Sequence, residues 1–298
     1  SGTQKSWGFQ FLNCRASAKG LRGNFMVKLQ SVSADEGKHH YRTIWVSDVH
    51  LGSKGCQAEA LVEFLNAHSC EYLYLVGDIF DLWALKRSIH WPKSHNEVIR
   101  TLIDLIRAGT KVIYIPGNHD ARFRDQTGLE FNGIIVKRQA LHVTADGRYF
   151  LVLHGDEFDS VVQYSQLVAM FGGKMYELLL QFNQPVNEIR SAMGFPYWSL
   201  SKFVKSKVKN AVSFISDYEK AVAREASRYD IDGVICGHIH QAEISSIHGL
   251  QYCNCGDWVE SCTALAEDQK GQIKLIYWHE EQRRRFESTQ DSTNTHAA

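Results

Sequence analysis

Five short stretches of the sequence combine residue types that bind metal ions or move protons. They are Asp48-Val49-His50, Gly77-Asp78, Gly117-Asn118-His119-Asp120, His154-Gly155-Asp156 and Gly237-His238-Ile239-His240. Each has a plainer explanation on its own, because an aspartate at a strand end often caps a turn and Gly-Asp is a common turn sequence. Together they supply carboxylate, imidazole and amide ligands, a mixture that favours Mn²⁺, with Fe or Zn²⁺ as alternatives, over Ca²⁺. The set is large enough for two ions.

The elements that would position these residues are strands, because an apolar run precedes most of the stretches. Runs at Tyr41–Ser47, Tyr72–Val76 and Lys111–Pro116 alternate with helical patterns at Gln57–His68 and Asn96–Ala108. Such alternation predicts a parallel sheet with right-handed crossovers and covered faces. Open α/β sheets bind ligands at the carboxyl ends of their strands, so the five stretches should meet at one rim.

The second half of the chain has a different pattern. Hairpin turns are predicted at Asp146-Gly147, His248-Gly249 and Lys270-Gly271, and a strand at Asp232–Ile235 leads into the fifth stretch. Cys253 and Cys255, at strand spacing, should place both thiols on one face. We expect a poorly patterned extension at 1–40, one domain at 41–279 that contains a helical insertion at about 157–229, and a flexible tail at 280–298.

Composition limits the classes of function. Lys plus Arg and Asp plus Glu both number 33, so no overall field attracts nucleic acid. The seven cysteines lack zinc-finger spacing and are typical of reduced thiols in a cytosolic protein. No run is long and apolar enough to span a bilayer, and no signal peptide is visible. These features predict a cytoplasmic protein without a transmembrane segment or a nucleic-acid partner.

The order D-x-H, GD, GNHD, HGD, GHxH resembles the signature of the calcineurin-like metallophosphoesterase superfamily, over roughly Tyr41 to Trp278. The sequence GDIFDLW at Gly77–Trp83 and the basic helical insertion are similar to the UDP-2,3-diacylglucosamine diphosphatase branch of lipid A biosynthesis. The resemblance implies a four-layer α/β/β/α sandwich with a helical cap. It also implies hydrolysis of UDP-2,3-diacylglucosamine to UMP and lipid X, in peripheral contact with the inner membrane.

The resemblance also implies a ligand set for two divalent ions. Asp48, His50 and His240 would hold the first ion, Asn118, His154 and His238 would hold the second, and Asp78 would bridge both. A shared carboxylate can keep two ions about 3.5–4 Å apart, where they bind and acidify a water. The resulting hydroxide would attack phosphorus in line while the ions neutralise the phosphoryl oxygens.

His119 is better used as a proton donor to the departing oxygen than as a further ligand, with Asp120 fixing its tautomer. Four cations are candidate substrate contacts: Arg122 and Arg124 after the third stretch, and Lys205 and Lys209 in the insertion. Asp81 and Asp156 each have two possible roles: each could support a liganding histidine, or each could cap a strand-to-helix turn. Trp83 could stack on a base, although a place in the core is the favoured interpretation.

The substrate has alternatives. Well-known members of the diphosphatase branch carry Gly-Asn-Arg-Asp where this chain has Gly117–Asp120. A phosphodiester or phosphomonoester of another soluble molecule is therefore the second candidate. A non-catalytic protein-binding scaffold on the same fold is the third, and it is disfavoured because all seven ligand positions are filled.

Overall fold

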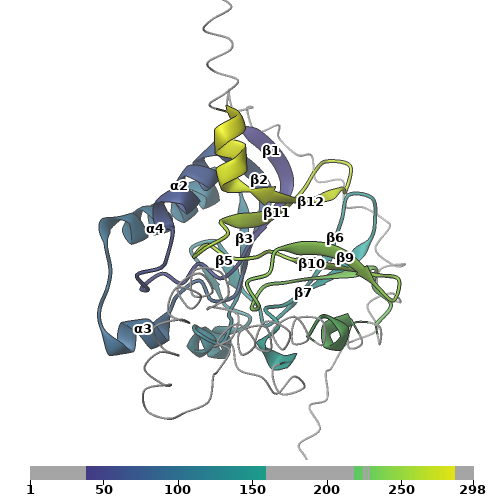
Figure 1. Ribbon diagram of the computed structural model, residues 1–298, viewed down its shortest axis with the longest axis horizontal. Coiled ribbons are helices and arrows are strands. Elements are labelled where there is room, and N and C mark those ends of the chain that lie inside the picture. The colour runs from purple at the N-terminus through teal and green to yellow at the C-terminus, as the bar shows by residue number, and fades with distance from the viewer. Residues whose placement is uncertain (1–37, 159–217, 224–225, 227–228, 286–298) are drawn as a thin grey trace, which may run out of the picture. The chain divides into compact units, whose positions relative to one another are not determined.

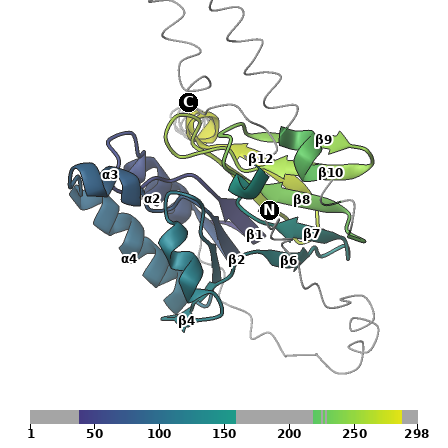
Figure 2. The ribbon, with the colours of Figure 1, turned by 90° about the horizontal axis from the view of Figure 1, so that it is seen from below.

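A computed structural model describes residues 38–158, 218–223, 226 and 229–285. Two β-sheets face each other, and helices cover the outer face of the first sheet (Figures 1 and 2). Within the described residues, no helix has the length and apolar character needed to cross a membrane.

The first sheet has seven strands in the order β12-β11-β1-β2-β3-β5-β4. Their bounds are β1 His39–Val46, β2 His68–Val76, β3 Lys111–Ile115, β4 Glu130–Phe131, β5 Ile134–Val136, β11 Thr263–Glu267 and β12 Ile273–Tyr277. Strands β1, β2, β3 and β5 are parallel, while β11, β12 and β4 add antiparallel edges. The parallel centre confirms the prediction from the alternating strands and helices.

The second sheet has five strands in the order β6-β7-β8-β10-β9. Their bounds are β6 Ala140–Val143, β7 Tyr149–Val152, β8 Gly233–Cys236, β9 Glu243–Ile247 and β10 Leu250–Asn254. All three predicted hairpins form. The one between β9 and β10 turns through His248 and Gly249, both with positive φ (52° and 83°), as a tight primed turn requires.

Two long helices, α2 Ala58–Ala67 and α4 Lys93–Arg107, lie together on the first sheet (Figure 2). Helix α4 follows Pro92, and beyond its C-cap Ala108 lies Gly109 with φ 103°, a conformation that favours glycine. Three short elements were not predicted: α3 Leu82–Arg87, η1 Ala121–Gln126 and η2 Asp156–Phe158. The first two follow directly on the second and third chemical stretches and so border the rim.

Alternation along the strands separates the interior into layers. In β1, Ile44 and Val46 face the helices, whereas Trp45 between them faces the second sheet. Period-two side-chain direction produces this split, so each strand of the first sheet contributes to two apolar layers. Cys253 and Cys255 both lie in the layer between the sheets, which confirms their predicted common face.

A third apolar layer covers the outer face of the second sheet. There Leu151 and Val234 pack with Tyr218 and Val222, which belong to a helical stretch at residues 218–223. This helix supplies the fourth layer of the predicted α/β/β/α sandwich. Most of the predicted insertion at about 157–229, and hence the cap, lies outside the described residues, as do residues 1–37 of the extension predicted at 1–40 and residues 286–298 of the tail predicted at 280–298. Residues 39 and 40 of that extension already belong to β1, and residues 280–285 of that tail are helical.

A buried carboxylate joins the two sheets away from the chemical stretches. Glu267 of β11 accepts hydrogen bonds from Arg42 (2.9 Å), from Thr43 Oγ1 (2.8 Å) and from the Ala145 amide (2.7 Å). His142 of β6 lies 2.8 Å from the same carboxylate through Nε2. Since the carboxylate is fully buried, its charge depends on these partners for compensation.

Candidate metal centre

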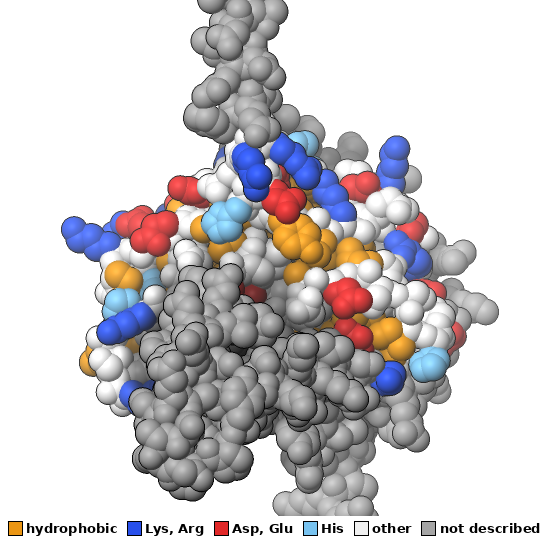
Figure 3. Space-filling model, in the orientation of Figure 1, with side chains coloured by type: hydrophobic (Ala, Val, Ile, Leu, Met, Phe, Trp, Pro, Cys, Tyr) orange, Lys and Arg blue, Asp and Glu red, His pale blue; other side chains and the backbone are white. Residues whose placement is uncertain are grey.

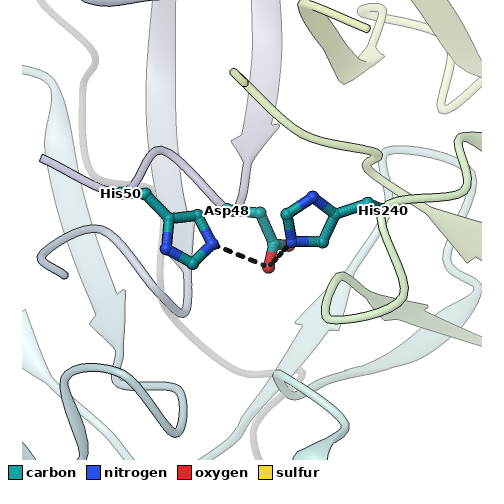
Figure 4. Close-up of side chains that lie close together, drawn as sticks. All are labelled: Asp48, His50 and His240. Carbon is teal, nitrogen blue, oxygen red and sulfur yellow. Dashed lines mark ion pairs between the residues drawn. The ribbon is translucent and has the colours of Figure 1, made fainter. Parts of the chain in front are cut away.

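The first cluster brings together Asp48, His50 and His240 from two sequence-distant loops (Figure 4). Asp48 Oδ1 lies 3.2 Å from His240 Nε2 and 3.9 Å from His50 Nε2. Asp48 Oδ1 and His50 Nε2 are both buried and have no hydrogen-bond partner among the described residues. Buried polar atoms without a partner are costly, so their common direction indicates a place for a cation.

The second cluster contains Asp78, His154 and His238, all buried. His154 Nε2 lies 3.4 Å from Asp78 Oδ2 and 3.3 Å from the side-chain oxygen of Asn118. His154 Nδ1 donates to the Val76 carbonyl at 3.0 Å. A carbonyl can only accept, so this bond leaves Nε2 as the nitrogen available to an ion.

Asp78 belongs to the second cluster and also approaches the first. Its Oδ2 is 3.4 Å from His154 Nε2 in the second cluster and 4.0 Å from His50 Nε2 in the first. Two atoms that each bind one ion at about 2.1 Å lie about 3.0–4.2 Å apart for angles of 90° to 180°. The separations in both clusters fall in this range, so the donor atoms fit two ions that share Asp78. The assignment of each residue as a ligand remains a prediction.

The loops that carry these residues have an unusual backbone. Five of the seven predicted ligands have positive φ: Asp48 (51°), His50 (55°), Asp78 (51°), His238 (72°) and His240 (54°). Residues with a Cβ seldom adopt this conformation, and such strain concentrates at functional sites. Hydrogen bonds hold it in place: Asp48 N–H donates to Gly77 O (3.0 Å) and His50 N–H to Asp78 O (2.9 Å).

Glycines allow the loops to approach each other closely. A Cβ on Gly117 would lie 2.3 Å from Asp78 Oδ1 and 2.6 Å from His154 Nε2. A Cβ on Gly237 would lie 2.4 Å from Asp48 Oδ2. These distances are shorter than those that real Cβ atoms make. Gly117 and Gly237 are therefore needed because a larger residue at either position would clash with a predicted ligand.

The electrostatics of the two clusters favour positive charge. Burial raises the pKa of Asp48, but the charges of His240, His154 and His50 together lower it below its usual range. Burial lowers the pKa of His240, whereas the Asp48 charge raises it to about 9. The site thus attracts protons or cations, and bound metal ions would displace the protons.

His119 lies beside the first cluster, and its orienting carboxylate differs from the one predicted. His119 Nδ1 hydrogen-bonds to Asp81 Oδ1 at 3.0 Å, and Asp81 Oδ2 lies 3.6 Å from His50 Nδ1. Asp81 also caps helix α3 by accepting from the Ala84 amide (2.7 Å). Asp81 therefore begins a helix, as one of its two predicted roles required, and it holds His119, which is not a predicted ligand. Its other predicted role, support of a liganding histidine, concerns His50 and remains a prediction.

Asp120 points away from His119 and organises the loops instead. Its carboxylate accepts from the Gly117 amide (2.6 Å), the Ile79 amide (2.8 Å) and the Tyr114 hydroxyl (2.6 Å). These donors come from both neighbouring strand ends, so they capture the side chain of Asp120 inside the turn. The expectation that Asp120 fixes the tautomer of His119 was wrong, because Asp120 hydrogen-bonds to these other donors and His119 hydrogen-bonds to Asp81.

A sixth strand end supports the first cluster and was missed in the sequence. Asn254, at the end of β10, donates to Gly237 O (2.8 Å) and accepts from the Gly256 amide (2.9 Å). The Trp258 amide donates to Asp48 O (3.0 Å). The sequence Asn254-Cys255-Gly256-Asp257 after an apolar run resembles the other stretches in composition and could have been found by the same criterion.

The four predicted substrate contacts differ in their surroundings. Arg124 binds Pro116 O (3.1 Å) and Asp156 (2.6 Å), so its guanidinium is engaged within the fold. Burial raises the pKa of Asp156, whereas Arg124, His154 and His238 together lower it, so this carboxylate interacts with the arginine and with both histidines. Arg122 is exposed and lines a hollow beside His119. Lys205 and Lys209 lie outside the described residues. Their role, like that of Arg122, remains a prediction.

Trp83 lies in a different place from the favoured interpretation. Its side chain is 47% exposed, and its ring lies against His119 with centroids 4.0 Å apart. Trp83 is therefore part of the rim and not of the core. On the face shown in Figure 3, cationic and anionic side chains of the described residues are interspersed, so this face has no large patch of one sign.

Comparison with known families agrees with this geometry. The model of the calcineurin-like phosphoesterase family matches residues 41–242, which include the seven predicted ligands. The chain belongs to this family and is a phosphoester hydrolase. Enzymes of the family use a dinuclear divalent metal centre, for which the clusters around Asp48 and Asp78 supply suitable side chains.

Three curated relatives have the name UDP-2,3-diacylglucosamine hydrolase. The protein of Shewanella pealeana is 24% identical and aligns with 79% of this chain and 97% of its own. That of Porphyromonas gingivalis is 25% identical, over 72% and 89% of the two chains. That of Ectopseudomonas mendocina is 27% identical, over 76% and 94%.

Proposed function

We propose that the protein hydrolyses UDP-2,3-diacylglucosamine to UMP and lipid X at a centre of two divalent ions, with Mn²⁺ as the native metal. The approach of Asp78 to histidines of both clusters is the observation that carries the two-ion centre. The name shared by three relatives, each aligned over 89% or more of its own length, supports the substrate. In the reaction, water adds to phosphorus, one P–O bond of the diphosphate breaks and the leaving phosphate takes up a proton.

The metal ligands in this proposal are those of the two clusters. Asp48, His50 and His240 would hold the first ion, Asn118, His154 and His238 would hold the second, and Asp78 would serve both. When bound, the ions lower the pKa of the attacking water and neutralise charge on the phosphoryl oxygens. Asp48 and Asp78 are the only carboxylates of the set, so they provide its negative charge.

His119 is the proton donor in this proposal. Its Nδ1 is held by Asp81, so a proton on Nε2 is the one free to move to the departing oxygen. The side chain of His119 is 19% exposed, which leaves it accessible to a ligand from the solvent side. Asp81 acts through His119 by fixing the direction of its ring.

The location follows from the substrate. A lipid with two acyl chains stays in a bilayer while its diphosphate reaches the aqueous surface, so the enzyme must meet it there. We place the protein in the cytoplasm, in peripheral contact with the inner membrane. The insertion at about 157–229 would cover the acyl chains, with Lys205 and Lys209 near the diphosphate.

A second candidate is a soluble phosphodiester or phosphomonoester. His119 favours it, since a histidine can protonate a poor leaving group, whereas arginine keeps its proton. The open hollow beside His119 is compatible with a small ligand.

Product analysis separates the two candidates. The metal-loaded chain is incubated with UDP-2,3-diacylglucosamine, a soluble phosphodiester and a phosphomonoester, and the products are identified by mass. Release of UMP and lipid X at the highest kcat/KM supports the first candidate, and preferred hydrolysis of a soluble ester supports the second. The variant Asp78→Ala controls for contaminating hydrolases. If His119→Arg turns over the lipid nucleotide faster than the unchanged protein does, the native substrate is a different one.

A further inference from the structure

A small hollow lies next to the candidate metal centre. It is lined by Trp83 and Lys86 of helix α3, by Asn118 and His119 of the third chemical stretch, and by Arg122 of η1. Its volume is about 220 Å³, including the part open to solvent. Because this figure includes open solvent, the hollow is a shallow site at the surface and not an enclosed cavity, and a ligand there would lie against its walls.

The indole of Trp83 forms an aromatic wall of this hollow. It packs against His119 at 4.0 Å between ring centroids, with 47% of its surface still exposed. Asp81 joins the two walls, because it caps α3 and hydrogen-bonds to His119. The aromatic surface is therefore held in a defined position relative to the metal centre.

Two cations line the same hollow as the indole. Lys86 and Arg122 are both exposed, and neither has a hydrogen bond or ion pair with any other residue that the structure describes. Arg124, two residues further on, is instead neutralised by Asp156. The free positive charge at this hollow thus belongs to Lys86 and Arg122.

We propose that this hollow binds the base of a nucleoside phosphate, which stacks on Trp83 while Lys86 and Arg122 neutralise its phosphate. This inference rests on the proposed function, because it assigns the nucleotide part of the substrate to a subsite. An acyl chain fits poorly, since it requires a long apolar groove without flanking charges. Inorganic phosphate makes no use of the aromatic wall.

Binding by calorimetry to the metal-loaded full chain tests the assignment. The probes are UMP, ribose 5-phosphate and inorganic phosphate, which differ by the base and the sugar. UMP should bind more tightly than ribose 5-phosphate by on the order of 5- to 100-fold, the range that one base–aromatic stack provides. Trp83→Ala should remove this difference, and Trp83→Phe should keep most of it. The affinity for inorganic phosphate should not change with either variant.

A matched control is Tyr277→Ala, which removes a similarly exposed aromatic ring (44%) from β12. It should leave the affinity for UMP unchanged. Lys86→Ala should weaken UMP and ribose 5-phosphate by the same factor, because it removes a phosphate contact and not the stack. Circular dichroism and Tm confirm that each variant is folded.

Two results would overturn the subsite: equal affinity of the unchanged protein for UMP and ribose 5-phosphate, or a Trp83→Ala variant that weakens all three probes alike. Failure of the proposed function would give a different result: the protein would not hydrolyse the lipid nucleotide, but it would still bind UMP more tightly than ribose 5-phosphate.

Discussion

Replacement of Asp78 is expected to remove both metal ions. Its Oδ2 lies 3.4 Å from His154 Nε2 and 4.0 Å from His50 Nε2, within reach of one ion on each side. Asp48 and Asp78 are the only negative charges among the seven predicted ligands, so Asp78→Ala removes half of the ligand charge. Changes of residues behind the ligands cost about 10- to 100-fold in metal affinity. Loss of a direct ligand to both ions should exceed that at each site.

The measurement is metal content after dialysis against metal-free buffer, by inductively coupled plasma mass spectrometry. The protein loaded with Mn²⁺ should keep about two equivalents, and Asp78→Ala should approach zero. Asp78→Asn separates charge from fold, since its amide oxygen can still accept the His119 amide, now 2.8 Å from Asp78 Oδ1. It should also lose both ions while keeping its Tm in the absence of metal.

Two comparisons make the result specific. Asp48→Asn should lose the first ion and retain the second, because Asp48 belongs to one cluster. Asp104→Asn, an exposed residue of α4 paired with Arg107, should keep both ions. Retention of one tightly bound ion by Asp78→Ala would show that Asp78 serves only one site, and the bridging geometry would then be wrong.

Three further predictions concern His119, Gly117 and the buried Glu267. His119→Ala should keep both ions and lose on the order of 10²–10⁴-fold in kcat, with a smaller loss on a p-nitrophenyl ester than on an alkyl ester; equal losses would argue against proton donation. Gly117→Ala should fold but bind less than two equivalents of metal, because its Cβ would lie 2.3 Å from Asp78 Oδ1; full metal content would contradict the space requirement. Glu267→Gln should lower the free energy of unfolding by about 3–5 kcal/mol near pH 7, as measured by urea unfolding. Burial raises the pKa of Glu267, but hydrogen bonds from His142, the Ala145 amide and Thr43 lower it below the ordinary value of 4.5. The stabilisation by the charged carboxylate is therefore fully present above about pH 4.5, and it is lost as the pH falls through the lower pKa of the folded state. The difference between the two proteins should therefore shrink in acid, and a difference independent of pH would refute the charge argument.

The strands, their hairpins and the convergence of the five stretches were predictable because they depend on local patterns. Period-two alternation in β1 and β2 placed residues such as Trp45 and Tyr74 in one layer and their neighbours in another. A parallel sheet places the carboxyl ends of its strands at one edge, so Asp48, Asp78 and Asn118 had to meet. The second sheet brings His154 and His238 to the same edge through its parallel strands β7 and β8.

The role of Trp83 and the supporting loop at Asn254 were not settled by the sequence. A tryptophan after a strand can face the core or the solvent, and the choice depends on where α3 begins. The cap formed by Asp81 sets that beginning and presents the indole to His119. Asn254 acts through the Gly237 carbonyl of another strand, a partner that only the pairing of β10 with β8 brings near.

The residue types of the site are thus a property of the sequence, while the partner of each side chain is a property of the tertiary structure. Asp81 and Asp120 both lie close to His119 in the predicted rim, and no spacing rule distinguishes them. The amides of Gly117 and Ile79 and the Tyr114 hydroxyl capture Asp120, which leaves Asp81 to hold His119. Hydrogen-bond direction depends on backbone conformation, including the left-handed turns at the strand ends, and these conformations are stable only when the surrounding loops are folded.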